Sequence, residues 1–205
     1  MTKRGLFDLR KMKLMEVPGE RARIRWIRHD DPEEMRRLVS IDVDENVRRY
    51  VLETTGDEEE LRSFAVGTKK SIGMAIAGKN EHVGEEESDR LQGWIAVYLD
   101  HPSRLKRAQE KGLLIYDGER VYLEIGFARY PLAKQGQMGS ALRSVVASLK
   151  RYLAGKKIGW CLTGYVHPNN EGSKKVLVAA GFKQVGELPY TLKEKHSDCL
   201  FLLEG

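Results

Sequence analysis

Apolar and polar residues alternate along short stretches of the chain, as they do in half-buried β-strands. In the stretch over residues 21–28, for example, Ala22, Ile24 and Trp26 alternate with arginines. Other stretches are largely apolar or interrupted by glycine, which is typical of buried strands. The pattern predicts strands over residues 21–28, 71–78, 91–99, 121–129, 158–166, 182–190 and 198–204.

Helical spacing marks the segments between these strands. The run from Asp30 to Glu34 combines an N-cap, a proline for the first helical position and first-turn acids. Asp57 and Glu60 have the spacing of a capping box, which predicts another helix start. Shorter helices are predicted near residues 47–51, 104–111 and 170–180, and the longest helix would bury Met138, Leu142, Val145, Val146, Leu149 and Leu153 on one face.

The order of these elements predicts an α/β fold of the α+β kind, with a mixed sheet and helices on its faces. A chain of 205 residues is long enough for one domain with a substantial core. With 41% hydrophobic and 32% charged residues, the composition is that of a globular protein. No apolar run reaches the about 18 residues that a membrane helix requires, and the first residues lack the apolar core of a secretory signal. We therefore expect no membrane partner.

Positive charge is concentrated at the N-terminus. Residues 1–28 contain nine Lys or Arg and three Asp or Glu, a net charge of +6, whereas the whole chain carries +5. The simplest interpretation is a solvated basic leader over residues 1–20, followed by a single domain over residues 21–205. Such a leader is also compatible with nucleic-acid binding. No interleaved aromatic residues support that role, so nucleic acid is not an expected partner.

Two cysteines, Cys161 and Cys199, lie within apolar runs and lack the spacing of metal ligands. We interpret them as reduced thiols in the core. Reduced thiols are typical of proteins in the cytoplasm, which is therefore the expected location. No metal site is predicted.

A glycine-bearing loop connects the strand over residues 121–129 to the longest helix. Unpaired N–H groups at a helix start bind anions, and glycine lets the backbone approach a phosphate closely. The loop therefore predicts a site for a phosphate-bearing ligand. Its sequence is Pro131-Leu132-Ala133-Lys134-Gln135-Gly136-Gln137-Met138-Gly139-Ser140.

A second segment follows the strand over residues 158–166. Asn170 would cap a helix, Ser173 would keep one face of that helix small, and Gly181 would take the left-handed position at its end. The segment begins His167-Pro168-Asn169-Asn170 and ends Ala180-Gly181-Phe182.

In this order, the two segments resemble those of the GNAT superfamily of acetyl-CoA-dependent N-acetyltransferases. The first corresponds to the family pattern Arg/Gln-x-x-Gly-x-Gly/Ala, with Lys134, Gln137 and Gly139 at its specific positions. The second corresponds to Asn-x-x-Ala-x-x-Leu-Tyr-x-x-x-Gly-Phe, whose asparagine and final Gly-Phe match here. The chain departs from the family at Gln137, where a glycine is usual, and at Leu177, where a tyrosine is usual.

The resemblance implies a GNAT-like, mostly antiparallel sheet of about six to seven strands. It also implies a splay between the fourth and fifth strands, over residues 121–129 and 158–166, where acetyl-CoA would bind. The residues implied to bind this cofactor are Phe127, Ala128, Arg129, Lys134, Gln135, Gly136, Gln137, Met138, Gly139, Ser140, Asn170 and Ser173.

For catalysis, the resemblance implies direct attack of an amine on the thioester, with main-chain N–H groups near Phe127 polarising the carbonyl. Glu124 is the candidate base, since several enzymes of the family carry a glutamate near this position. A carboxylate within an apolar strand is costly unless it is paired or used. The alternative for Glu124 is therefore a structural ion pair with a neighbouring helix.

The proton donor for the departing thiolate is not provided by the family pattern, because Leu177 replaces the usual tyrosine. Tyr190 and His167 are the candidate donors. A surface or core role is the alternative for each of them.

The leading hypothesis is an N-acetyltransferase that moves an acetyl group from acetyl-CoA to a primary amine of a small molecule or protein. The competing hypothesis is a non-catalytic acyl-CoA-binding or interaction module that retains the GNAT fold, which Leu177 and Gln137 motivate. Expected partners are acetyl-CoA and an amine acceptor, and a homodimer is left open.

Overall fold

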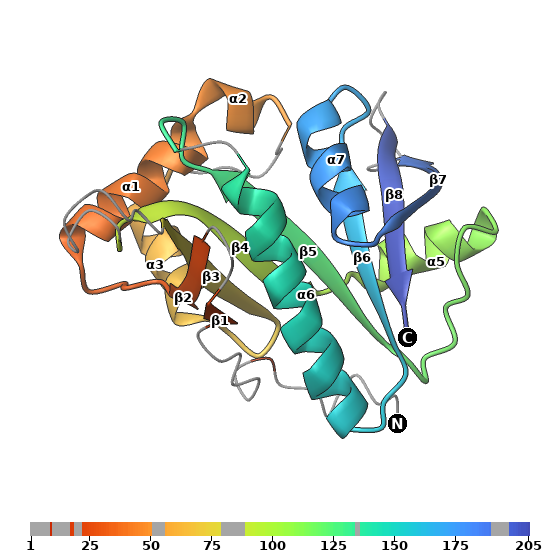
Figure 1. Ribbon diagram of the computed structural model, residues 1–205. Helices are drawn as coiled ribbons and strands as arrows, with labels where there is room; N and C mark the ends of the chain where they lie inside the picture. Colours follow the sequence, from red (N-terminus) through yellow and green to blue (C-terminus); the bar gives the residue numbers. More distant parts are fainter. Residues whose placement is uncertain are drawn as a thin grey trace.

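The strands form one eight-stranded sheet in the spatial order β1-β2-β3-β4-β5-β6-β8-β7 (Figure 1). All neighbouring strands are antiparallel except β5 and β6, which are parallel. The computed structural model describes residues 9, 17–18, 22–50, 56–78, 89–133, 136–189 and 197–205. The strands are β1 Val17–Pro18, β2 Ala22–Trp26, β3 Ser71–Gly78, β4 Leu91–Leu99, β5 Val121–Arg129, β6 Trp160–Val166, β7 Lys183–Pro189 and β8 Ser197–Glu204.

The sheet confirms the mixed, mostly antiparallel architecture, and every predicted strand is present. The additional strand is β1, a two-residue strand in the segment expected to be a leader. Leu9, in the same segment, is buried in the core, and its N–H donates to the carbonyl of Lys69 at 3.2 Å. These described parts of the expected leader pack with the domain. The division at residue 20 stays a prediction.

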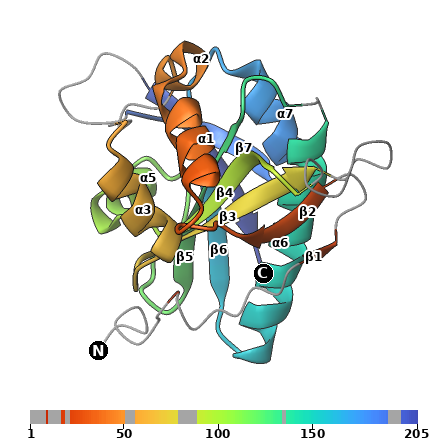
Figure 2. The ribbon, with the colours of Figure 1, turned by 90° about the vertical axis from the view of Figure 1, so that its left-hand side faces the viewer.

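Helices lie on both faces of the sheet (Figures 1 and 2). α6 and α7 cover one face, whereas α1, α3 and α5 cover the other. Each layer has its own apolar cluster against the sheet, so the sheet is buried on both sides. The helices are α1 Pro32–Val43, α2 Glu45–Arg48, α3 Glu58–Val66, α5 Pro102–Glu110, α6 Gln137–Gly155 and α7 Glu171–Ala179.

Strand β5 separates the two helical layers. Val121, Leu123 and Ile125 belong to the cluster beneath α6, whereas Tyr122 packs with α5 and Ala128 with α1 and α3. This alternation follows from the two-residue period of a strand and confirms the face assignment made from the sequence. The even-numbered side chains of β5 therefore face away from α6.

Three helices begin at the residues predicted to cap them. Asp31 accepts hydrogen bonds from the main-chain N–H groups of Glu33 and Glu34. Asp57 and Asn170 accept main-chain N–H groups at the starts of α3 and α7. Each cap satisfies donors that a helix start leaves unpaired, which contributes about 1 kcal/mol.

The two cysteines are free, buried thiols on β6 and β8, as predicted. Burial raises the pKa of the Cys161 thiol to about 12 and also raises the pKa of Cys199, so both thiols are protonated at neutral pH. Among the helices that the structure describes, none combines the length and the apolar character needed to cross a membrane.

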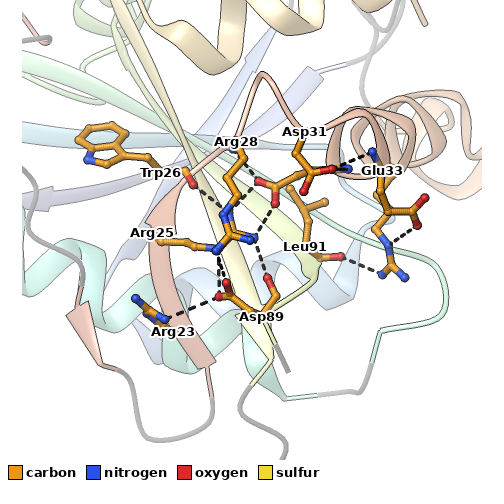
Figure 3. A network of polar contacts seen from close by, with 10 residues as sticks. Arg23, Arg25, Trp26, Arg28, Asp31, Glu33, Asp89 and Leu91 are labelled. Atoms are coloured by element: carbon orange, nitrogen blue, oxygen red, sulfur yellow. Dashed lines mark hydrogen bonds and ion pairs between the residues drawn. The ribbon is translucent and has the colours of Figure 1, made fainter. Parts of the chain in front are cut away.

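A buried ion network ties β2 to the first turn of α1 and to the start of β4 (Figure 3). The guanidinium of Arg25 donates to both oxygens of Glu34, at 2.7 and 2.5 Å. Asp89 accepts from Nε of Arg25 at 3.2 Å and also pairs with Arg23 and Arg28. Burial alone would lower the pKa of Arg25, but the hydrogen bond and charge of Glu34 outweigh it, and the pKa is raised. The network therefore holds α1 against the sheet through charged groups.

Candidate active site

The parallel strands β5 and β6 pair only over their first halves. Their register runs from Val121 opposite Trp160 to Glu124 opposite Thr163, and both fully described strands continue without a further pair. A cavity of about 980 Å³ lies beside the point where the pairing of β5 and β6 ends. The splay expected between these two strands is thereby confirmed.

Five of the predicted catalytic and cofactor-binding residues line the cavity. They come from three different elements of the chain, so the fold brings together groups that are far apart in sequence. They are Glu124, Phe127, His167, Asn170 and Ser173.

The main-chain direction of β5 decides which N–H groups face the opening. Hydrogen-bonded residues alternate along an antiparallel pair. Asp100 N–H donates to the carbonyl of Tyr122 at 3.0 Å, across β4 and β5. Val121 N–H donates to the carbonyl of Gly159 at 2.9 Å, on the β6 side. Even-numbered residues of β5 thus direct their main chain towards β4, and odd-numbered residues direct theirs towards β6.

Beyond the last pair with β6, Ile125 and Phe127 therefore direct their N–H groups into the opening. Arg129, at the end of β5, has the same parity. Ala128 was expected to bind the cofactor with them, but its main chain faces β4, where it is opposite Trp94. Its side chain is buried beneath α1. This alternation leaves Phe127 as the predicted main-chain donor nearest the cavity.

The loop after β5 leads into α6 without a capping side chain. Nη1 of Arg129 donates to the carbonyl of Ala133 at 2.7 Å, which holds the turn. Gly136 is the N-cap, with φ 86° in the left-handed region that glycine tolerates, and it has no side chain with which to cap the helix. A helix start of this kind favours an anion, and this role for α6 stays a prediction. Lys134 and Gln135 lie outside the described residues.

At the first turn of α6, the main chain is more accessible to a ligand than the side chains are. Met138 and Ser140 are buried. A Cβ on Gly139 would meet only the tip of Arg143, at 3.8 Å, so a ligand can approach this backbone closely. Gln137 directs its side chain towards the end of β3. The cavity between β5 and β6 is lined by other residues, and a phosphate role for these positions stays a prediction.

Helix α7 begins at the wall of the cavity. The side chain of Asn170 accepts the N–H of Ser173 at 3.1 Å, and both residues line the cavity. At the other end, Gly181 has φ 93°, and Phe182 N–H donates to the carbonyl of Leu177 at 3.1 Å. The helix thus has the cap and the left-handed end that its sequence predicts.

Glu124 lies in the cavity beside Arg104 of α5. One guanidinium nitrogen of Arg104 is 3.0 Å from each carboxylate oxygen of Glu124. The two side chains are 19% and 24% exposed, respectively. Glu124 therefore lines the cavity and also pairs with a helix, and its role as a base stays a prediction.

A buried polar cluster lies beside this ion pair. Asp100 is 0% exposed and accepts hydrogen bonds from the hydroxyls of Thr163, at 2.6 Å, and Tyr165, at 2.8 Å. Burial raises the pKa of Asp100 in spite of these hydrogen bonds. Burial and the charge of Asp100 also raise the pKa of Tyr165, so the phenol keeps its proton at neutral pH.

The candidate proton donors differ in their placement. His167 follows β6, and its ring lies 5.4 Å from that of Tyr50 between centroids. Nδ1 of His167 accepts the N–H of Asn169 at 3.2 Å, which assigns the proton of a neutral imidazole to Nε2. Leu177, at the position of the family's tyrosine, is buried. Tyr190 lies outside the described residues.

Three aromatic side chains form another wall of the cavity. The ring of Phe64 lies 5.6 Å from that of Trp94 and 6.4 Å from that of Tyr98, between centroids. Tyr98 covers Gly126 of β5, where a Cβ would come within 3.1 Å of its ring. The wall is therefore aromatic, and it lies close to Glu124, which is opposite Tyr98 in the sheet.

No model of a protein family and no curated protein matches the sequence. Solved structures do match it. A GNAT-family acetyltransferase from Bacillus anthracis is 20% identical, with a TM-score of 0.62 over 93% of this chain and 98% of its own. RimL, a ribosomal L7/L12 alpha-N-protein acetyltransferase in complex with coenzyme A, is 12% identical, with a TM-score of 0.62 over 93% and 98%. The chain has the GNAT fold.

A third solved structure extends the comparison. The microcin C7 self-immunity acetyltransferase MccE, in complex with acetyl-CoA and AMP, is 11% identical. It has a TM-score of 0.59 over 91% of this chain and 93% of its own. The GNAT fold thus covers both the sheet and the helices that surround the cavity.

Within this GNAT fold, an ion pair between Glu124 and a neighbouring helix was anticipated from the sequence, but Arg104 was not identified as the partner. The predicted helix began at residue 104, whereas α5 begins at Pro102 with His101 as its N-cap. The signal was available, because a cap-and-proline pair directly follows Asp100 at the end of an apolar strand. Reading it would have placed Arg104 in the first turn of the helix.

Proposed function

We propose that the protein is an N-acetyltransferase that moves the acetyl group of acetyl-CoA to a primary amine by direct attack. The observation that carries this proposal is the opening between β5 and β6. There, the N–H groups of Ile125 and Phe127 face a cavity that also contains the carboxylate of Glu124. The GNAT fold shared with RimL, bound to coenzyme A, and MccE, bound to acetyl-CoA, supports the choice of donor.

In this proposal, the parts of acetyl-CoA contact different elements. The pyrophosphate would bind the uncapped start of α6 at Gly136, because unpaired N–H groups and the helix dipole favour an anion there. Lys134 and Gln135 would contribute from the loop. The pantetheine arm would pass along the unpaired edge of β5 and beside Asn170 and Ser173.

The chemistry requires a base and a donor for the carbonyl oxygen. The amine nitrogen would form a bond to the thioester carbon as the carbon–sulfur bond breaks, giving an acetamide and the free thiol of coenzyme A. Glu124 would accept the proton that the nitrogen loses. Phe127 N–H would stabilise the negative charge that develops on the carbonyl oxygen. His167 or Tyr190 would supply the proton that the departing sulfur takes up.

The acceptor would enter beside the aromatic wall of Phe64, Trp94 and Tyr98. We retain both a small-molecule amine and a protein amine as acceptor classes. The structural neighbours include a ribosomal-protein acetyltransferase and a self-immunity acetyltransferase, which supports keeping both.

Calorimetric titration with acetyl-CoA tests donor binding, and labelled acetyl-CoA with a panel of amines tests transfer. We expect saturable heat in the micromolar to millimolar range, roughly 1 μM–1 mM, and a labelled acetamide. Glu124→Gln is the matched variant, which should bind acetyl-CoA as the parent does and transfer it much more slowly. No heat and no thermal shift at about 1 mM acetyl-CoA would contradict the proposal.

A second function is a non-catalytic acyl-CoA-binding module with the same fold. Leu177 is buried where the family has its tyrosine, and Gln137 stands where it has a glycine. This version predicts acetyl-CoA binding without transfer to any amine in the panel. Glu124→Gln would then change nothing in either assay.

We place the protein in the cytoplasm, which the two buried free thiols support. A homodimer also remains part of the proposal. Sedimentation velocity of the purified protein would distinguish it from a monomer.

A further inference from the structure

The side chain of Arg104 is held in place by contacts with Tyr165 and Glu124. Arg104 lies in the first turn of α5, where its N–H donates to the carbonyl of His101 at 3.0 Å. Its guanidinium lies over the ring of Tyr165, 4.9 Å from the ring centre, and pairs with Glu124. A planar guanidinium that stacks on a ring and binds a carboxylate has its orientation set by both contacts.

The orientation of Tyr165 is fixed by the buried residue Asp100. Its hydroxyl donates to Asp100 at 2.8 Å, and the same carboxylate oxygen accepts the hydroxyl of Thr163 at 2.6 Å. Asp100 is fully buried and lies two residues before the start of α5, and Arg104 interacts with its charge. A chain of contacts therefore leads from the buried Asp100 through Tyr165 and Arg104 to Glu124 in the cavity.

This chain of contacts joins β5 and β6 at the point where their pairing stops. Glu124 and Thr163 are the last paired residues of the two strands. Tyr165, further along β6, is on the wall of the opening. Where the main chain no longer connects the strands, these side chains do. Glu124 is therefore held at a set position relative to both walls.

We propose that Arg104 is a positioning residue for Glu124, holding its carboxylate in one orientation and in its charged form, and that Tyr165 and Asp100 hold Arg104. The importance of this arrangement for acetyl transfer rests on the proposed function, in which Glu124 is the base. Proton transfer requires a base within hydrogen-bond reach of its proton, so a fixed carboxylate is more effective than a mobile one.

The test uses Arg104→Met, which removes the charge, and Arg104→Lys, which keeps it. Lys106→Met is the matched control, because Lys106 is exposed on the same helix and lies outside the cavity lining. Each substitution is made in the parent and in the Glu124→Gln variant, and kcat and KM are measured for the amine and for acetyl-CoA. Circular dichroism melts confirm that each variant is folded, and Arg104→Lys remains informative if Arg104→Met is not.

Arg104→Met should lower kcat for the amine up to about 100-fold, with KM for acetyl-CoA unchanged. Arg104→Lys should restore part of the loss, and Lys106→Met should have no effect. In the Glu124→Gln background, Arg104→Met should cost nothing further, because Arg104 acts through Glu124. An equal loss in that background would overturn the proposal, since Arg104 would then act on the acceptor or on the fold.

A second measurement does not depend on turnover. Carbon-13 NMR follows the carboxylate of Glu124, whose signal is assigned by its absence in Glu124→Gln. Its titration midpoint should move to higher pH in Arg104→Met, stay nearly unchanged in Arg104→Lys and be unchanged in Lys106→Met. The other charged or titratable groups that line the cavity, together with the buried Asp100 beside it, are the same in all of these variants: Asp42, Arg49, Tyr50, Glu60, Tyr98, Asp100, His101, Arg107, Tyr165, His167 and Asp198.

An unchanged midpoint in Arg104→Met would overturn the proposal whatever the activity of the protein. Tyr165→Phe removes the hydroxyl and keeps the ring, so a smaller midpoint shift and a partial loss of kcat are expected. If the midpoints move as expected but the parent acetylates no amine, the positioning of Glu124 is supported and the proposed acetyl transfer is what fails.

Discussion

Two arginine–glutamate pairs of this protein have similar chemistry and different surroundings. Arg25 and Glu34 are each 3% exposed and are joined by two separate nitrogen–oxygen contacts, at 2.7 and 2.5 Å. Glu34 also accepts the N–H of Arg28 at 2.7 Å. Arg104 and Glu124 are 19% and 24% exposed, and Nη1 of Arg104 contacts both oxygens. The first carboxylate is enclosed by donors, whereas the second lies in a cavity.

The comparison shows that pairing by itself does not distinguish a structural carboxylate from a functional one. Burying a charge costs several kcal/mol per ion, which only a well-satisfied partner set repays. Glu34 has such a set and offers a substrate no access. Glu124 pairs with Arg104 and also lines an open cavity. Access to its carboxylate from the cavity is therefore the property that makes Glu124 a candidate base.

Glu124→Gln should have the largest effect on activity. Loss of a general base lowers kcat by about 10²–10⁴-fold. The free energy of unfolding should fall by less than about 1 kcal/mol, because the pair is partly exposed and the amide keeps its shape. Steady-state kinetics and urea denaturation measure the two quantities. Full turnover in this variant would show that both pairs of the comparison are structural.

Glu34→Gln should show the opposite balance. Removing one partner of a buried pair leaves Arg25 with an uncompensated charge, so the free energy of unfolding should fall by about 3–5 kcal/mol. Glu33→Gln, at an exposed position on the same turn, is the control and should change it by less than about 0.5 kcal/mol. Urea denaturation gives both values, and kcat of the folded protein should be retained. Equal losses of unfolding free energy in the two variants would show that burial does not decide the cost of removing one partner.

Asp89 belongs to the same ion network as Arg25 and Glu34, and its charge makes the free energy of unfolding depend on pH. Burial opposes its charge, but the hydrogen bond and charges of Arg28 and Arg25 outweigh burial and hold the pKa of Asp89 below its usual value. A carboxylate with a lowered pKa stabilises the fold above its unfolded pKa, about 4, and loses that contribution as pH falls through its folded pKa.

Asp89→Asn should therefore cost about 1–3 kcal/mol of unfolding free energy at pH 7, with the cost shrinking below about pH 4. Urea denaturation of both proteins across this range measures the difference. A cost that is the same at neutral and acidic pH would show that the charge of Asp89 is not what stabilises the network.

Glu58→Gln should have the smallest effect. Glu58 pairs with Arg62 one turn along α3, and their side chains are 57% and 44% exposed. Exposed pairs of this spacing contribute about 0.3–0.5 kcal/mol. Chemical denaturation at low and high salt provides the measurement. A loss of unfolding free energy as large as that of Glu34→Gln would mean that burial does not decide how much each ion pair contributes to stability.

Local patterns account for the elements that were predicted well. The strands β3, β4 and β5 have the bounds expected from the sequence, because strand period and flanking turns are properties of neighbouring residues. The caps Asp31 and Asp57 were found for the same reason, since a cap acts within one helical turn. Strand β1 was not predicted, because two residues carry no period.

The sequence by itself determined which side chains of β5 face which helical layer and where α7 starts and ends. It also predicted that Cys161 and Cys199 are free thiols. These follow from alternation, capping and apolar surroundings, which are encoded locally. Only the tertiary structure decided that Arg104 contacts Glu124 and that Tyr165 contacts Asp100. Those contacts require α5 and β6 to pack at the same place beside β5, and the pattern of a single segment does not specify its distance from another segment.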